Sequence, residues 1–188
     1  MSAKNEDWRK WLKFSCTGCG NCCKGTIVLI TGGDVRRIME ATGMPARDFV
    51  HFFSNVEMSK RDSLWIRLGN RRVAMGLRWK WDQSPRRCMF LGDDNMCGIY
   101  AHRPVTCRSH PFEIKTDDNW GVTKLGISEV VDCPHEWDGE HTLRELKSTE
   151  RWNCNQVEDF ETKVREWNRK RSGKRTAREF LRFVGLES

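Results

Sequence analysis

A dense run of cysteines near the start of the chain most constrains how this sequence can fold. Four cysteines fall within eight residues: Cys16, Cys19, Cys22 and Cys23. Spacing by two residues lets a tight turn aim successive thiolates at one point, and Gly18 and Gly20 permit the positive φ angles of such a turn. Amides that point at sulfur stabilise thiolate charge. The C-x2-C-x2-C spacing also opens the bacterial run that holds a 4Fe-4S cluster, so we expect this segment to nucleate a metal centre.

The cysteines are expected to be reduced. The chain begins with the polar sequence MSAKNEDWRKW, which has no apolar signal-peptide core, and no apolar run approaches the roughly 18 residues of a membrane span. These features predict a cytoplasmic protein with no membrane partner. Disulfides are rare in that compartment. The nine cysteines are therefore expected to serve metal binding or catalysis.

Later cysteines extend the expected ligand set. They are Cys88, Cys97, Cys107 and Cys133, and with the first four they make eight, enough for two four-coordinate centres. Cys133 precedes a proline, as the last cysteine of a ferredoxin run does. Side chains of neighbouring residues point apart, so Cys22 and Cys23 are not expected to ligate one small centre together. Either one of these two lies outside the ligand shell, or they face two different centres.

The ninth cysteine and three histidines carry weaker signals. Cys154 lies inside a predicted long helix, away from turns and glycines, and is expected to be an ordinary thiol. His102, His110 and His135 lie near the later cysteines. Each could be a metal ligand or a donor to a thiolate, although a surface or capped histidine is the more common case.

The remaining pattern predicts an α+β fold: a small, irregular, metal-stapled domain with short antiparallel hairpins and a C-terminal helical segment. Helices are expected over 5–13, 33–41, from Pro45 to Phe53, over 142–170 and after Thr176, where capping patterns recur. Strands are expected over 26–30, 64–68 and 71–79, the last two joined by Gly69 and Asn70. Two further hairpins are expected, one from 88–91 and 96–100 and one from 110–115 and 120–127.

Charge divides the chain unevenly. Residues 161–188 hold nine basic and four acidic residues, a net charge of +5 out of +7 for the whole chain. We therefore predict a cysteine-cluster metal-binding domain over 1–139 and a basic C-terminal helical extension, 140–188, packed on it. The extension could contact nucleic acid or an acidic protein, although a solvated helical face is the more common explanation.

The second block of cysteines also brings a family resemblance. The pattern Cys97-x-Ile-Tyr-x2-Arg103-Pro-x2-Cys107-Arg108-x2-Pro-Phe, together with the first cysteine run, resembles the YkgJ-type cysteine-cluster family of zinc- or iron-chelating domains. The cysteine region is also similar to that of flagellin lysine N-methylase, in which a 4Fe-4S cluster is associated with the fold. This resemblance implies iron–sulfur as the leading metal. Arg103 and Arg108 would then be counter-charges to an anionic cluster.

Three functions follow from these patterns. The first is an iron–sulfur protein with a redox or cluster-dependent accessory role, working with a protein partner or an electron donor or acceptor. The second is a zinc-binding module that docks a partner or nucleic acid through its basic C-terminal helices. The third is a cluster-dependent, methyltransferase-like enzyme, for which the sequence identifies no catalytic residue. The segment Gly32-Gly33-Asp34 could hold an anion at a helix start, although a plain turn into the helix is the preferred interpretation.

Overall fold

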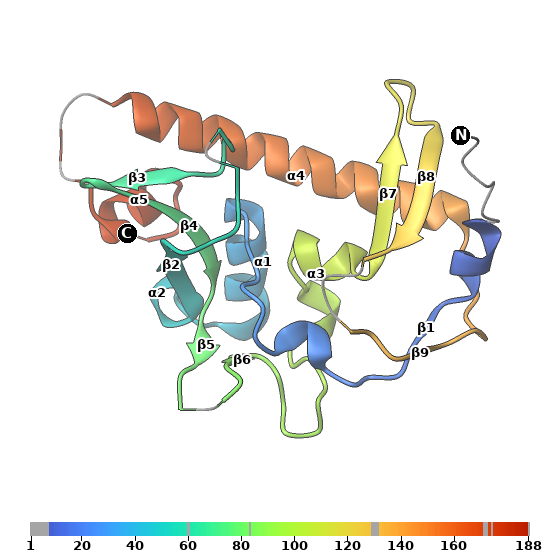
Figure 1. The fold of residues 1–188 in the computed structure, drawn as a ribbon. Helices are drawn as coiled ribbons and strands as arrows, with labels where there is room; N and C mark the ends of the chain where they lie inside the picture. Colours follow the sequence, from blue (N-terminus) through green and yellow to red (C-terminus); the bar gives the residue numbers. More distant parts are fainter. Residues whose placement is uncertain are drawn as a thin grey trace.

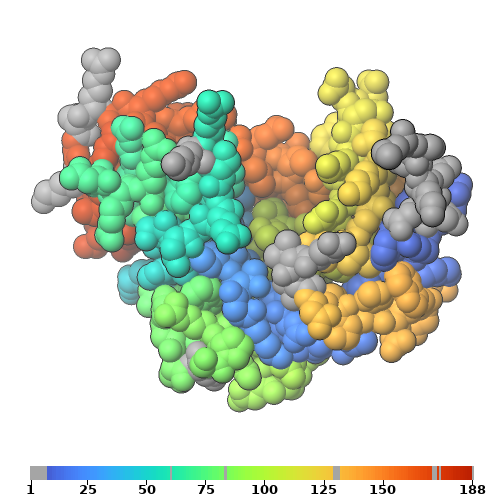
Figure 2. Space-filling view, in the orientation of Figure 1, coloured from blue at the N-terminus to red at the C-terminus, as the bar shows by residue number. Residues whose placement is uncertain are grey.

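One long helix spans the molecule and joins two lobes. A computed structural model describes residues 8–59, 61–82, 84–128, 132–170, 173 and 175–187. Helix α4, Leu143–Arg169, runs along one side, with the strands β2–β4 near its C-terminal end and the hairpin β7–β8 near its N-terminal end (Figure 1). The visible face is hollowed between these lobes (Figure 2). The mixture of helices with short antiparallel sheets confirms the α+β class.

A three-stranded antiparallel sheet forms the centre of the first lobe. Its order is β2 (Val50–Phe53), β4 (Arg71–Leu77) and β3 (Ile66–Leu68). Gly69 has a φ of 57°, which suits the tight turn between β3 and β4, so the predicted hairpin is confirmed. The strand β4 ends at Leu77, and β5 (Trp79–Lys80) pairs separately with β6 (Arg87–Cys88).

Two helices precede this sheet. Helix α1, Gly32–Thr42, begins at a capping box between Thr31 and Asp34 and ends at Gly43, whose φ is 70°. The Asp34 carboxylate accepts hydrogen bonds from the Thr31 amide and hydroxyl at 2.7 and 2.9 Å. The chain's own carboxylate therefore caps this helix start, in agreement with the preferred interpretation of a plain turn. Helix α2 is Ala46–Phe49.

Three predicted elements are wrong in detail. The helix expected from Pro45 to Phe53 ends at Phe49, because residues 50–53 pair with β4 instead. The strand expected over 26–30 is reduced to an isolated bridge of Leu29 with Gly76, flanked by backbone hydrogen bonds to β4. The hairpin expected from 88–91 and 96–100 contains one bridge, between Leu91 and Cys97. The ladder partner of Cys88 is Trp79, across the preceding hairpin β5–β6.

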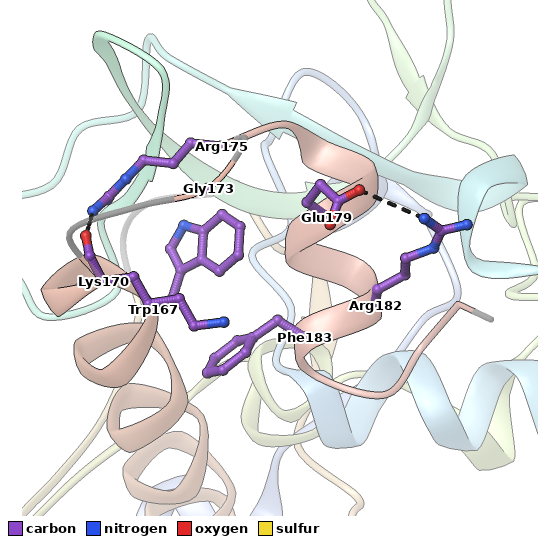
Figure 3. Close-up of a pocket in the computed structure, with 7 residues that line it drawn as sticks. All are labelled: Trp167, Lys170, Gly173, Arg175, Glu179, Arg182 and Phe183. Carbon is purple, nitrogen blue, oxygen red and sulfur yellow. Dashed lines mark hydrogen bonds and ion pairs between the residues drawn. The ribbon is translucent and has the colours of Figure 1, made fainter.

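The C-terminal helices belong to the same hydrophobic core as the sheet. Helix α4 begins at the predicted capping box of Thr142 with Glu145, and α5, Ala177–Phe183, is capped by Thr176. Trp167 packs on Phe180 at a ring distance of 5.4 Å and donates from Nε1 to the Arg67 carbonyl at 2.8 Å. Figure 3 shows Trp167 and Phe183 lining a cavity of about 320 Å³ between α4 and α5.

Shorter elements complete the fold. The hairpin β7 (Phe112–Thr116) and β8 (Val122–Ile127) forms as predicted. The helix expected over 5–13 is a 3-10 helix, η1, at Trp8–Lys13, and residues 5–7 lie outside the described residues. Among the helices that the structure describes, none has the length and apolar character to cross a membrane.

Candidate metal centre

The first cysteine run folds as a tight loop that ends in the 3-10 turn η2, Asn21–Cys23. Gly18 and Gly20 have φ angles of 68° and 69°, as the spacing predicts. The Gly18 amide donates to the Cys16 sulfur at 3.4 Å, and the Asn21 amide donates to the Cys19 sulfur at 3.5 Å. The loop therefore presents two sulfurs that already accept backbone N–H groups, an arrangement common around metal-bound cysteines.

A short strand pair joins this loop to Cys133. Strand β1, Ser15–Cys16, pairs antiparallel with β9, His135–Glu136. The Thr17 hydroxyl donates to the Pro134 carbonyl at 3.0 Å. The Asn21 side chain donates to the Asp132 carbonyl at 3.1 Å. These contacts, across more than one hundred residues of sequence, hold Cys133 beside the first run.

A second set of contacts brings in the central cysteines. The Gly25 amide donates to the Arg86 carbonyl at 2.7 Å, and Lys24 forms an isolated β-bridge with Arg87. The residues that follow the first run therefore lie along the edge of β6, beside Cys88. After β6 the chain turns back, and a β-bridge between Leu91 and Cys97 places Cys97 near the end of this strand.

Cys107 lies on a short helix, α3, Val105–Ser109. The Val105 amide at its start donates to the buried Asp34 carboxylate at 3.0 Å. The Thr106 hydroxyl donates to the Leu29 carbonyl at 3.0 Å. These two bonds hold Cys107 against the segment that follows the first cysteine run.

The eight thiols divide into two electrostatic neighbourhoods. We call Cys16, Cys19 and Cys133 the outer group, because burial and then the charges of Cys19 and Cys16 raise the pKa of Cys133 to about 11. We call Cys23, Cys88, Cys97 and Cys107 the inner group, because each shifted pKa within it responds to other members. Cys22 interacts with both groups.

Burial distinguishes the two groups. It is the main reason that the pKa of Cys88 rises to about 11 and that the pKa of Cys107 rises further. Cys88 is buried, whereas Cys16 is exposed. The other thiols of both groups are intermediate in exposure, so Cys88 is the buried member of the inner group and Cys16 the exposed member of the outer group. Metal binding at the inner group must displace protons from thiols that are otherwise neutral at neutral pH.

The adjacent pair Cys22 and Cys23 shares a proton. Their sulfurs lie 3.9 Å apart. A hydrogen bond from Cys23 lowers the pKa of Cys22 to about 6, and the positive charges of Arg103 and Lys24 act in the same direction. The pKa of Cys23 is raised, because its thiol donates that bond and is desolvated. Cys22 is thus the thiolate most ready to accept a metal at neutral pH.

The two arginines of the second block have different surroundings. Arg103 is near enough to lower the pKa values of Cys22 and Cys107. Arg108 instead lies over the Trp152 ring, 4.9 Å from its centroid, and donates to the Ala101 carbonyl at 3.2 Å. Arg103 is therefore the counter-charge beside the thiols, and Arg108 joins α3 to α4.

The other sequence candidates lie in separate surroundings. His110 has its pKa lowered by burial, and its Nε2 has no hydrogen-bond partner among the described residues. His135 contacts the Cys133 carbonyl through Nδ1 at 2.7 Å, and His102 lies on the exposed turn η3, Tyr100–His102. The Cys154 thiol lies 3.7 Å from Glu150, which is its hydrogen-bond acceptor on α4.

The donor chemistry fits a thiophilic metal. Thiolate ligands suit zinc and iron–sulfur clusters rather than magnesium or calcium. The outer group draws its cysteines from two separated stretches, the first run and Cys133, and the inner group draws them from the first run, from β6 with the turn after it, and from α3. Within the described ranges, no three or more Cys, His, Asp or Glu side chains are grouped closely enough to hold a metal ion as they stand. The sulfurs that would ligate a metal are therefore identified by which cysteines lie near one another and not by a preformed ligand geometry.

Sequence reasoning missed one residue that positions the site. Asp34 is fully buried and ties α1 to the start of α3 through Val105. The Thr31-x-x-Asp34 spacing is a capping-box signal and could have identified the helix start. No local pattern indicates that the same carboxylate also holds the helix that carries Cys107.

Comparison with known proteins bears on the same stretch of cysteines. A family model named CxxCxxCC, described as a putative zinc- or iron-chelating domain, matches residues 15–126, more than half of the chain. The matched range contains seven of the eight clustered cysteines and ends before Cys133. No curated protein and no solved structure matches.

Proposed function

The chain belongs to the CxxCxxCC family, whose model describes a zinc- or iron-chelating domain, and from that premise we propose that its cysteines hold a 4Fe-4S cluster. We propose further that the protein serves a redox or cluster-dependent accessory role in the cytoplasm. A cluster of this kind accepts and donates single electrons, with a potential set by charge, hydrogen bonds to sulfur and exposure. The membership itself supports metal binding by the cysteine cluster.

The observation that carries this proposal is the separation of the thiols into two neighbourhoods. Cys22 completes the outer group, whose first three members follow the ferredoxin spacing and whose fourth, Cys133, comes from a distant part of the chain and precedes a proline. The four inner thiols form a second four-cysteine centre. This division assigns Cys22 to the outer centre and Cys23 to the inner one. Their sulfurs lie 3.9 Å apart, so the two side chains do not point apart as the sequence predicted, and the two centres would be neighbours.

The chain's own residues adjust each centre differently. The amides that donate to Cys16 and Cys19 reduce the charge on those sulfurs, which favours the reduced form of a cluster. Arg103 and Lys24 add positive charge beside Cys22. The outer centre, at the surface, is the one that an electron donor or acceptor could approach. The inner centre, behind buried thiols, holds the fold together.

One specific observation favours zinc as the alternative metal. Cys88 and Cys97 flank a compact turn closed by the bridge at Leu91, and knuckle-like turns often present zinc thiolates. A zinc module would stabilise the fold and dock a partner. A methyltransferase-like activity is the least favoured function, because it would need a substrate pocket beside the cysteines.

Anaerobic purification followed by absorption spectroscopy and metal analysis tests the proposal. We expect a broad absorption band at about 400 nm and about four irons and four sulfides per cluster. Colourless protein that contains only zinc would exclude the iron–sulfur proposal.

Serine variants test the two-centre division. We expect Cys19→Ser to lose the outer centre and Cys107→Ser to lose the inner centre, each retaining the other metal. Cys154→Ser is the matched control and should keep the full metal content. If Cys19→Ser and Cys107→Ser each removed all metal from protein that remains folded, a single shared centre would replace the two-centre arrangement.

A further inference from the structure

The hairpin β5–β6 carries positive charges that no carboxylate neutralises. It presents Arg78, Lys80, Arg86 and Arg87. Arg78 donates to the Arg47 carbonyl at 2.9 Å, and Lys80 donates to the Leu91 carbonyl at 2.7 Å. Backbone carbonyls satisfy these N–H groups but leave the formal charges in place. Among the ion pairs of the described residues, none includes any of these four cations.

A half-exposed tryptophan lies beside one of these cations, Arg86. Trp81 is 48% exposed, and the Arg86 guanidinium lies 4.6 Å from its ring centroid. Edge contacts with Trp79 at 5.6 Å and His51 at 5.4 Å hold the indole in place. Burying such a ring would be favourable, and the surrounding residues fix its orientation instead of covering it. The hairpin therefore offers a flat aromatic surface beside unneutralised cations.

The basic C-terminal helices differ in this respect. There, four cations pair with carboxylates of the same C-terminal segment at 3.3 to 3.5 Å: Lys163 with Glu166, Arg165 with Glu161, Arg178 with Glu187, and Arg182 with Glu179. The last of these pairs is visible in Figure 3. The segment that is most basic in sequence is thus partly neutralised by its own carboxylates. The β5–β6 hairpin has four cations and only Asp82 as a carboxylate between residues 78 and 87.

We propose that the β5–β6 surface, formed by Arg78, Lys80, Trp81, Arg86 and Arg87, binds single-stranded nucleic acid. Cationic side chains contact the phosphates, and an exposed aromatic ring stacks with a base. A base is free to stack on Trp81 only when it is unpaired, which selects single strands over duplex. Arginine beside the ring adds a cation–π contribution to such stacking. The surface lies at the opposite end of the first lobe from α5 (Figure 1).

Fluorescence anisotropy of a labelled oligothymidylate, titrated with the metal-loaded full chain, tests the proposal. With four phosphate contacts, we expect the logarithm of the association constant to fall with the logarithm of salt at a slope of about −3. Trp81→Ala should weaken binding roughly 5- to 150-fold. Arg86→Gln, a surface change that leaves Trp81 in place, should make the slope shallower by about 0.7.

Two matched controls separate this surface from general effects. Trp137→Ala removes an equally exposed indole, 50% exposed, that lies between Glu136 and Asp138. Arg182→Gln removes one cation from the C-terminal helices. Both controls should bind the oligothymidylate as the unaltered chain does. Metal content and circular dichroism, measured on every variant, show that the cysteine centres and the fold are intact.

Three results would overturn the proposal. The first is no binding of oligothymidylate by the unaltered chain at low salt, which would favour a protein partner for Trp81. The second is binding that Arg182→Gln weakens while Trp81→Ala and Arg86→Gln leave it unchanged. The third is equal affinity for duplex and single strand, unaffected by loss of Trp81. None of these results depends on which metal the cysteines hold.

Discussion

Replacing Asp34 should uncouple the start of α1 from the helix that carries Cys107. The carboxylate is fully buried and accepts hydrogen bonds from the Thr31 amide, the Thr31 hydroxyl and the Val105 amide, and it is paired with Arg37. Asp34→Ala leaves the Val105 N–H without an acceptor, at about 1–3 kcal/mol, and removes the cap, at about 0.5–2 kcal/mol. Arg37 also loses its partner. Because these terms overlap, we expect a loss of about 3–5 kcal/mol, the range for removing one partner of a buried pair.

Urea unfolding followed by far-UV circular dichroism, with metal content measured in parallel, tests this expectation. Asp34→Asn keeps the side-chain volume, but its single carbonyl oxygen can serve either Thr31 or Val105, so it should be intermediate. Glu145→Ala is the matched control, because Glu145 plays the same capping-box role on α4 at an exposed position. If Asp34→Ala proved no more destabilising than Glu145→Ala, the link between α1 and α3 would not have the energetic role assigned to it.

Three further changes test other parts of the structure. Gly20→Ala should lower the stability and the metal content more than Gly43→Ala does. Both glycines have a positive φ, but an added methyl group at Gly20 meets atoms at 3.2 Å, whereas at Gly43 it meets nothing within 4 Å. Urea unfolding and iron analysis measure the two effects. Trp167→Phe keeps an aromatic ring but removes part of the buried indole and leaves the Arg67 carbonyl without this donor, so chemical denaturation should show a loss of at least about 1–2 kcal/mol. The pKa of His51 is lowered by burial and by a nearby arginine, so the unfolded chain binds the proton more readily. The contribution of His51 to stability is therefore present above the unfolded pKa of about 6.5 and is lost as the pH falls below that value. The unfolding free energy, measured across this pH range, should fall more steeply in the unaltered chain than in His51→Phe.

Some elements follow directly from short-range patterns. The capping box of Thr142 with Glu145 predicted where α4 begins, and the hairpin over β3 and β4 followed from a glycine-containing turn between two β-branched runs. Helix α1 was predicted from its periodicity and its cap. In each case, the residues that decide the structure lie within one or two turns of each other. Hydrogen bonds and packing inside such a window are strong enough to set the local conformation.

Errors occurred where a distant partner decided the outcome. The stretch 50–53 has helical neighbours, but its backbone pairs with β4, so it became a strand. The β-branched stretch 26–30 became a bridge because only Leu29 meets β4 in register. Cys88 pairs with Trp79 rather than with the segment that follows its own turn. Pairing with a distant strand overrides propensity in the first two cases, and pairing across the preceding hairpin does so for Cys88, because a strand is stabilised by its neighbour more than by its own residues.

The sequence by itself determined the glycine-containing loop of the first four cysteines, predicted four later cysteines as further ligands, and indicated the helices that frame them. Only the tertiary structure decided which thiols are neighbours, that Arg103 rather than Arg108 lies beside them, and which cations remain without a carboxylate. Spacing along the chain controls contacts within a turn. Contacts such as that of Thr17 with Pro134, 117 residues apart, depend on how every intervening element packs, and no local pattern contains that information.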